Sequence, residues 1–115
     1  MRAEEIKLLV QIPCLNEEDN LANVINSVNR NINGISAVKI LVIDDGSTDE
    51  TVGVAISNGA DFILKKPATR GLADSFKLGQ EFFLRNDFDI LVNTDGDNQF
   101  FQESIEELIA PIMTN

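Results

Sequence analysis

Two aspartates at the end of an apolar run have the residue types and spacing of a metal site. Asp95 and Asp97 flank Gly96 and follow the apolar run 90–92. Carboxylates at this spacing on a turn can ligate Mg²⁺ or Mn²⁺ while diphosphate oxygens and water complete the octahedron. Such a metal neutralises charge on a departing diphosphate. On the motif alone a plain type I turn remains the alternative, because Asp, Gly and Asn all favour turns.

A second acidic pair, Asp44 and Asp45, follows the apolar run 38–43 in the same way. At the carboxyl ends of parallel strands, side chains face the ligand crevice. We therefore expect a carboxylate here to accept a hydrogen bond from a base N–H or a ribose hydroxyl. The alternative is a plain helix start, because acids suit a helix N-terminus and glycine suits the turn. Four carboxylates at two strand ends would repel one another unless a cation or ligand donors lay among them.

Two further segments are candidate ligand contacts. Residues 13–17 close the first predicted strand and open the first predicted helix, where a ligand binds if the fourth strand lies on the first strand's other side. Capping by Asn16 is the alternative explanation. Arg70 and Gly71 start the third predicted helix, where glycine permits close backbone approach and arginine pairs with phosphate. A surface arginine with no ligand is the commoner outcome.

These residues are positioned by an alternation of strand and helix. Apolar runs predict four strands, over 8–12, 38–43, 61–64 and 90–93. Helical spacing predicts four helices, over 21–32, 47–58, 72–83 and from 105 onward. Pro13 is expected to end the first strand, and Ser47 with Glu50 to form a capping box. The alternation implies βαβ units with parallel strands, so the predicted class is α/β.

Composition restricts the function classes. The 115 residues suit one domain, and the formal charge of -10 argues against nucleic acid as a partner. Histidine is absent, which removes the usual general base and disfavours zinc. Cys14 is the single cysteine, in keeping with a reducing, cytoplasmic compartment. No apolar run approaches the roughly 20 residues of a membrane helix.

Four motifs, taken in order, carry a resemblance to a known family. They are Ile12-Pro13-Cys14-Leu15-Asn16-Glu17, Ile43-Asp44-Asp45-Gly46-Ser47-Thr48-Asp49, Arg70-Gly71-Leu72 and Asn93-Thr94-Asp95-Gly96-Asp97-Asn98-Gln99. Together they resemble the inverting glycosyltransferases of family 2, most closely the branch of dolichol-phosphate mannosyltransferase and the polyprenyl-phosphate sugar transferases. The resemblance implies a GT-A fold, a Rossmann-like, mostly parallel sheet with flanking helices and the strand order 3-2-1-4. Residues 1–115 would form only its nucleotide-sugar-binding half, a truncated GT-A fold.

The resemblance also implies roles for individual residues. The base and ribose would be bound by Pro13, Leu15, Glu17, Ile43 and Asp45. The diphosphate and a Mg²⁺ or Mn²⁺ ion would be bound by Asp95, Gly96, Asp97 and Gln99. Asp97 is the favoured metal ligand, and it would act in catalysis with Asp95. The chain departs from the family pattern in two places: an aromatic residue is missing near Leu15, and Phe100 replaces a histidine.

The activity implied is inverting transfer of a hexose from a UDP- or GDP-sugar. One candidate acceptor is a polyprenyl phosphate at the membrane surface, with the full-length enzyme peripheral at the cytoplasmic membrane. This chain alone would keep donor recognition, and its turnover stays open.

Two alternatives come from other classes. A receiver-like signalling domain is also α/β and acidic, although its acids follow different strands. A truncated, non-catalytic remnant could fold, as a homodimer through its open sheet edge, and bind nothing.

Overall fold

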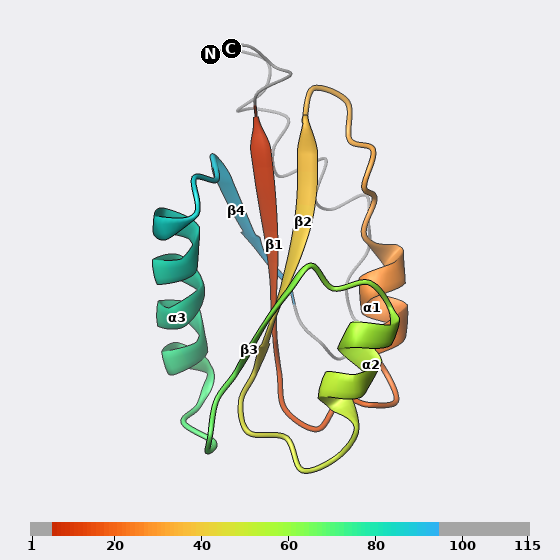
Figure 1. Ribbon diagram of the computed structural model, residues 1–115, viewed down its shortest axis with the longest axis vertical. Helices are drawn as coiled ribbons and strands as arrows, with labels where there is room; N and C mark the ends of the chain where they lie inside the picture. Colours follow the sequence, from red (N-terminus) through yellow and green to blue (C-terminus); the bar gives the residue numbers. More distant parts are fainter. Residues whose placement is uncertain (1–5, 95–115) are drawn as a thin grey trace.

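The computed structural model of the chain describes residues 6–94 (Figure 1). Its strands are β1 (Lys7–Cys14), β2 (Ala37–Asp44), β3 (Phe62–Lys65) and β4 (Ile90–Asn93). Its helices are α1 (Leu21–Ser27), α2 (Thr51–Ser57) and α3 (Leu72–Arg85). The motif Asp95-Gly96-Asp97, Gln99 and the helix predicted from residue 105 lie outside the described residues. None of the helices in residues 6–94 is long and apolar enough to cross a membrane.

The four strands form one parallel sheet in the order β3-β2-β1-β4. This confirms the α/β class and the expected order. Strand β1 pairs with β2 along its whole length, up to Cys14 beside Asp44, and with β4 up to Gln11 beside Asn93. Because all strands run the same way, their carboxyl ends lie at one end of the sheet, at the bottom of Figure 1.

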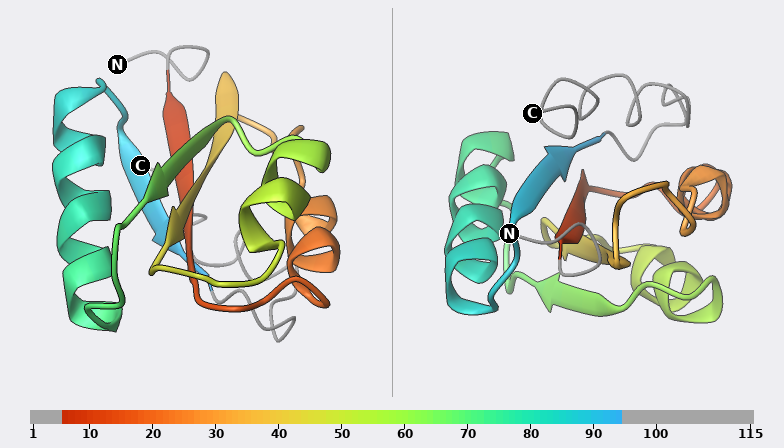
Figure 2. Two further views of the ribbon diagram at one scale, coloured as in Figure 1. Left: turned by 60° about the horizontal axis from the view of Figure 1, so that its bottom comes forward. Right: turned by 90° about the horizontal axis from the view of Figure 1, so that it is seen from above.

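Helices cover both faces of the sheet (Figures 1 and 2). Alternate residues of β1 and β2, such as Val10 and Ile40, pack against α1 and α2, whereas Leu9, Leu41 and Ile43 pack on the α3 side. Central parallel strands buried on both faces are expected to be nearly all apolar, as these are. The sheet therefore has a hydrophobic core on each face.

The first helix is shorter than its apolar spacing predicts. It ends at Ser27, and Val28 is already extended, with φ -73° and ψ 123°. Val28 and Ile32 are still buried, so the spacing correctly identified core residues but not their secondary structure. The segment after the helix is held by Arg30, whose guanidinium donates to carbonyl and carboxylate oxygens of Val38, Gly59 and Asp61.

Pro13 does not end the first strand, which continues to Cys14. Proline lacks an N–H, and successive residues of a parallel strand direct their backbone groups to opposite neighbours. The Gln11 carbonyl accepts from the Thr94 amide on the β4 side, so Pro13, two residues later, faces the same side. There it lies beyond the last β1–β4 pair of the described residues, and pairing with β2 is unaffected.

Candidate functional site

A pocket of about 310 Å³ opens at the carboxyl ends of β1 and β2, beside the start of α3. It is lined by Pro13, Cys14, Leu15, Asp45, Thr69, Gly71, Leu72 and Ser75. Leu15 and Leu72 are 40% and 54% exposed, although they are large apolar side chains. Exposed apolar groups around one carboxylate are typical of a ligand site.

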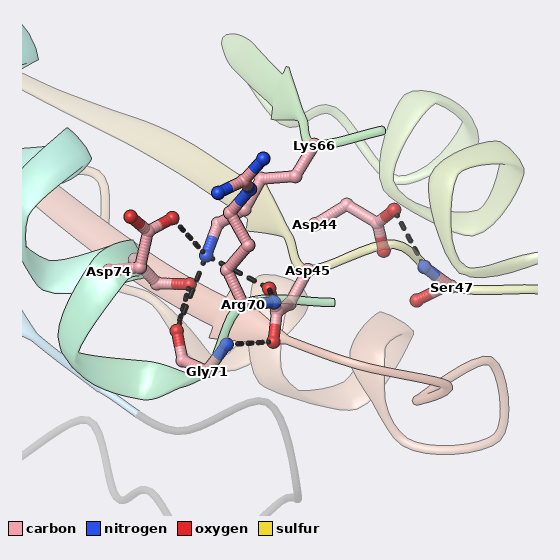
Figure 3. Close-up of polar contacts among 8 residues, drawn as sticks. Asp44, Asp45, Ser47, Lys66, Arg70, Gly71 and Asp74 are labelled. Carbon is pink, nitrogen blue, oxygen red and sulfur yellow. Dashed lines mark hydrogen bonds and ion pairs between the residues drawn. The ribbon is translucent and has the colours of Figure 1, made fainter. Parts of the chain in front are cut away.

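Asp45 is the acidic group of this pocket, and the chain itself already binds both its oxygens (Figure 3). Oδ1 accepts from the Lys66 ammonium at 2.9 Å and from the Arg70 amide at 2.8 Å. Oδ2 accepts from the Gly71 amide at 2.9 Å. The carboxylate at the end of β2 therefore fixes the loop that leads into α3, and this loop forms one wall of the pocket.

Lys66 is the functional candidate that sequence reasoning missed. Its side chain is only 4% exposed and lies between the carboxylates of Asp45 and Asp74, at 2.9 and 3.0 Å. Its third contact is the Gly71 carbonyl, at 3.3 Å. Lys65 and Lys66 are adjacent lysines that the sequence does not distinguish. It indicates only that two successive side chains at the end of a strand point to opposite faces of the sheet.

The electrostatics of this pair keep both groups charged. Burial alone would raise the pKa of Asp45, but the Arg70 amide, the Lys66 ammonium and the Gly71 amide outweigh it and hold the pKa below its ordinary value. Burial alone would lower the pKa of Lys66, but hydrogen bonds to Asp45 and Asp74 raise it above its ordinary value. At neutral pH the cluster is an ammonium between two carboxylates, with one net negative charge.

Gly46 lets the pocket wall approach the end of β2. Its φ is +87°, and a Cβ there would lie 2.8 Å from the Thr69 nitrogen and 2.9 Å from the Ala68 carbonyl carbon. Both contacts are with backbone, which cannot swing aside as a side chain can. The glycine of the Asp-Asp-Gly motif is therefore required by close packing as well as by its turn.

Asp44 points away from Asp45, toward α1 and α2 (Figure 3). It is fully buried, and its Oδ2 accepts from the Ser47 amide at 3.1 Å. Within residues 6–94 its Oδ1 has no hydrogen-bond partner. The carboxylates of the two adjacent aspartates therefore lie on opposite sides of the sheet, and of the two only Asp45 lines the pocket.

The loops after β1 and β2 are joined by reciprocal hydrogen bonds. The Asn16 amide donates to Ser47 Oγ at 2.8 Å, and Asn16 Oδ1 accepts from the Thr48 amide at 2.9 Å. Asn16 has a φ of +53° and is not a helix cap; α1 begins at Leu21. The predicted N-cap is wrong because the Asn16 side chain bonds to the other loop instead of its own helix.

The predicted capping box is wrong for the same reason. Ser47 Oγ is occupied by the Asn16 amide, and α2 begins at Thr51 with no side-chain cap from Glu50. Thr51 Oγ1 accepts from the Glu17 amide at 2.9 Å and itself donates to Asp49. These contacts fix the position of the β1 loop, which carries Leu15 at the pocket mouth.

The remaining predicted residues fall in different places. Pro13 and Leu15 line the pocket with Asp45. Ile43 is fully buried in the core on the α3 side, and the Glu17 amide is used in the loop contact with Thr51. Arg70 contributes its backbone amide, and its side chain is exposed at the rim.

Cys14 also lines the pocket but is not a nucleophile. Burial, followed by the carboxylates of Asp44, Glu17 and Asp49, raises the pKa of its thiol to about 12. The thiol is therefore protonated at neutral pH.

Within residues 6–94, no group of three or more acidic or cysteine side chains could hold a metal ion. Asp45 does not fit such a role, because an ammonium and two amides already surround it. Asp95 and Asp97, which the sequence analysis predicts as ligands of Mg²⁺ or Mn²⁺, lie outside the described residues. The chain reaches them through Thr94, whose amide donates to the Gln11 carbonyl at the end of β4.

Comparison of the sequence with known proteins identifies the family. The family model described as Glycosyl transferase family 2 matches residues 9–115. Polyprenol monophosphomannose synthase of Mycolicibacterium smegmatis is 31% identical over 92% of this chain and 41% of its own length. Protein RfbJ of Shigella flexneri is 33% identical over 94% of this chain and 78% of its own length. The chain thus spans about two fifths of the synthase.

Solved structures show the same GT-A, Rossmann-like fold. Glucosyl-3-phosphoglycerate synthase from Mycobacterium tuberculosis, in complex with Mn²⁺, UDP and glucosyl-3-phosphoglycerate, has a TM-score of 0.76 and 27% identity over 98% of this chain and 42% of that one. The same enzyme in complex with Mg²⁺ and UDP has a TM-score of 0.76 and 28% identity. Neighbours of this fold are therefore known with a divalent metal and a nucleoside diphosphate bound.

Proposed function

The chain belongs to glycosyl transferase family 2, and we propose that it binds the nucleoside of a nucleotide diphosphate sugar in the pocket beside Asp45. One observation carries the proposal: an apolar pocket, with Asp45 as its one charged acceptor among residues 6–94, lies where the β1 and β2 strands end. Ligands of open α/β sheets bind at this end of the strands. The UDP complexes of the structural neighbour support the same class of ligand.

The described residues divide the work of donor binding. Pro13, Leu15 and Leu72 offer apolar surface for a base, and Asp45 offers a hydrogen-bond acceptor to a base N–H or ribose hydroxyl. Arg70, exposed at the start of α3, is placed to pair with a phosphate. Glu17, Ile43 and Asp44 act from outside the pocket lining, by holding the loop and the strand end in place.

We assign the diphosphate and the metal to residues that follow β4. Asp95 and Asp97 would ligate Mg²⁺ or Mn²⁺, and Gly96 and Gln99 would contact the diphosphate. With a cation bound there, these residues would help to stabilise the negative charge of the departing diphosphate. Residues 1–115 thus form the donor-binding half of a larger catalytic domain.

The reaction of the full-length enzyme would be inverting transfer of a hexose. The similarity to a polyprenol monophosphomannose synthase favours a polyprenyl phosphate at a membrane surface as the acceptor. A lipid phosphate carries its own nucleophilic oxygen, so the protein needs chiefly to position the two substrates. The family match removes the reason for a receiver-like domain.

Calorimetric titration of the 115-residue chain tests this proposal. UDP and GDP, and their sugars, are titrated with and without Mn²⁺ into wild type and Asp97→Asn. At least one diphosphate should bind, more tightly with Mn²⁺, and the gain from Mn²⁺ should vanish in the variant. The control is Asp87→Asn, the same change in the turn between α3 and β4 at the other end of the sheet. No binding of any donor would identify the chain as a non-catalytic remnant.

A further inference from the structure

The hydrogen-bonding capacity of Asp45 is almost exhausted before a ligand arrives. An ionised carboxylate offers about four lone-pair positions, two on each oxygen. Oδ1 has two partners, the Lys66 ammonium and the Arg70 amide, and Oδ2 has one, the Gly71 amide. One acceptor position remains, on Oδ2 of a side chain that lines the pocket and is 9% exposed.

Lys66 cannot itself serve a ligand. An ammonium has three N–H donors. They match three acceptors of the chain: Asp45 Oδ1, Asp74 Oδ2 and the Gly71 carbonyl. The side chain is 4% exposed, so it is a fixed internal cation that occupies one lone pair of Asp45.

Nucleobases differ in the number of donors they present to such a group. Uracil has one ring N–H between two carbonyl oxygens. Guanine presents a ring N–H and an exocyclic amine side by side, and these match two acceptors. Cytosine has an unprotonated ring nitrogen at the position of the uracil N–H, so a carboxylate that accepts from its neighbouring exocyclic amine is repelled by the lone pair of that nitrogen. A single free acceptor pairs with the one ring donor of uracil and leaves one donor of guanine unpaired.

We propose that Lys66, held between Asp45 and Asp74, is a specificity-determining positioning residue that restricts the pocket to a uracil-type base. The proposal rests on the proposed function and extends it by naming the donor class as uridine diphosphate sugars. Lys66 acts through Asp45: it occupies Oδ1 and holds the carboxylate so that only Oδ2 faces the ligand.

Asp74 is the second carboxylate that holds the Lys66 ammonium in place. It stands in the first turn of α3 and reaches Lys66 from the side opposite Asp45. Without it, Lys66 would keep two of its three contacts and could turn away from Oδ1. The base preference should therefore depend on Asp74 as well, although less strongly than on Lys66.

UDP, GDP and CDP share the ribose and the diphosphate, so a comparison of their affinities measures the contribution of the base. With Mg²⁺ present, UDP should bind the wild-type chain at least about tenfold more tightly than GDP or CDP, since one unpaired buried donor costs about this factor. CDP controls for ring size, because it differs from UDP only in the base edge.

Two variants test the role of the lysine. Lys66→Met keeps an unbranched side chain only one atom shorter but frees an acceptor on Oδ1, so the UDP-to-GDP affinity ratio should fall severalfold toward one. Asp74→Ala should lower the ratio partially. Lys65→Met and Glu81→Ala, equal charge changes outside the cluster, should leave it unchanged. If far-ultraviolet circular dichroism shows that Lys66→Met is unfolded, Asp74→Ala, at a half-exposed position, decides.

The outcomes separate this inference from the proposed function. A wild-type chain that binds GDP or CDP as well as UDP overturns the base assignment and leaves donor binding intact. A ratio that stays at the wild-type value in both folded variants overturns the role of Lys66. A chain that binds no nucleoside diphosphate overturns both proposals.

Discussion

Asp44 and Asp45 are adjacent in sequence, yet their carboxylates lie on opposite sides of the sheet. Asp44 is buried on the α1 and α2 side, where its Oδ2 accepts from the Ser47 amide. Asp45 is on the α3 side, where an ammonium and two amides surround it. The pair is therefore not a joint cation site, and each acid holds one loop at the carboxyl end of β2.

Asp45→Asn should destabilise the fold by about 3 kcal/mol, the usual cost of breaking a buried ion pair from one side. The amide NH₂ would face donors of Lys66 and Gly71, and Lys66 would keep only the partly exposed Asp74 as a charged partner. Urea unfolding measures the difference. Asp87→Asn, in the turn after α3, should change stability by no more than about 0.5 kcal/mol. Equal effects of the two substitutions would contradict a structural role for Asp45.

The stability difference between wild type and Asp45→Asn should depend on pH. The folded-state pKa of Asp45 lies below 3.8, so its contribution is present above that value and is lost as the pH falls through the folded pKa. Lys66 has a pKa raised above 10.5, so its contribution is present below that value and is lost only as the pH rises through the raised one. The difference should be flat from about pH 5 to 9 and should shrink below about pH 4. Urea midpoints across this range test it, and a difference that grows in acid would be the wrong sign.

The sheet could be predicted from sequence because its signals are local. The runs of β1 and β2 are apolar on both faces, as central parallel strands must be, and turn residues separate them from the helices. Strand order did not follow from periodicity; it was implied by the family resemblance. Periodicity also failed at Val28 and Ile32, because burial against the core, which it detects, does not require a helix.

The site was less predictable because its contacts join distant residues. Asn16 and Ser47 have typical capping chemistry, but their partners lie 31 residues apart in the other loop. Lys66 meets Asp45 across 21 residues, and nothing in the sequence separates it from the exposed Lys65. Local rules assign such side chains to their own helix or to solvent, and only the tertiary fold shows their partners.

Gly46→Ala should cost more stability than Gly59→Ala. Both glycines have nearly the same φ, +87° and +89°, so a side chain strains the two backbones alike. At Gly59 a Cβ meets nothing within 4 Å, whereas at Gly46 it meets the backbone of Ala68 and Thr69. We expect an extra cost of about 1–3 kcal/mol from overpacking at Gly46, measured by thermal unfolding. Equal costs would mean that the turn, and not the pocket wall, requires this glycine.

Thr51→Val should loosen the contact between the β1 and β2 loops. The hydroxyl of this fully buried residue accepts from the Glu17 amide and donates to Asp49. An equally sized valine removes this acceptor from the Glu17 amide and leaves Asp49 Oδ1 with its bond to the Thr51 amide. We expect a loss of about 1–3 kcal/mol in urea unfolding. Thr48→Val is the matched control, because the Thr48 hydroxyl is exposed and makes only a 3.4 Å contact. A control variant as unstable as Thr51→Val would show that the hydrogen bonds of the Thr51 hydroxyl are not responsible for the loss.

Cys14 should be unreactive in the native chain, although it lines the pocket. A thiol with a pKa of about 12 is almost wholly protonated at pH 8, and only the thiolate is alkylated at a useful rate. Its surroundings are the cause: burial and three neighbouring carboxylates both oppose the negative form. Iodoacetamide at pH 8, followed by mass spectrometry, should leave the folded chain unlabelled and should label the chain unfolded in about 8 M urea. Rapid labelling without denaturant would show that the β1 loop opens far more often than its bonds to Ser47 and Thr51 allow.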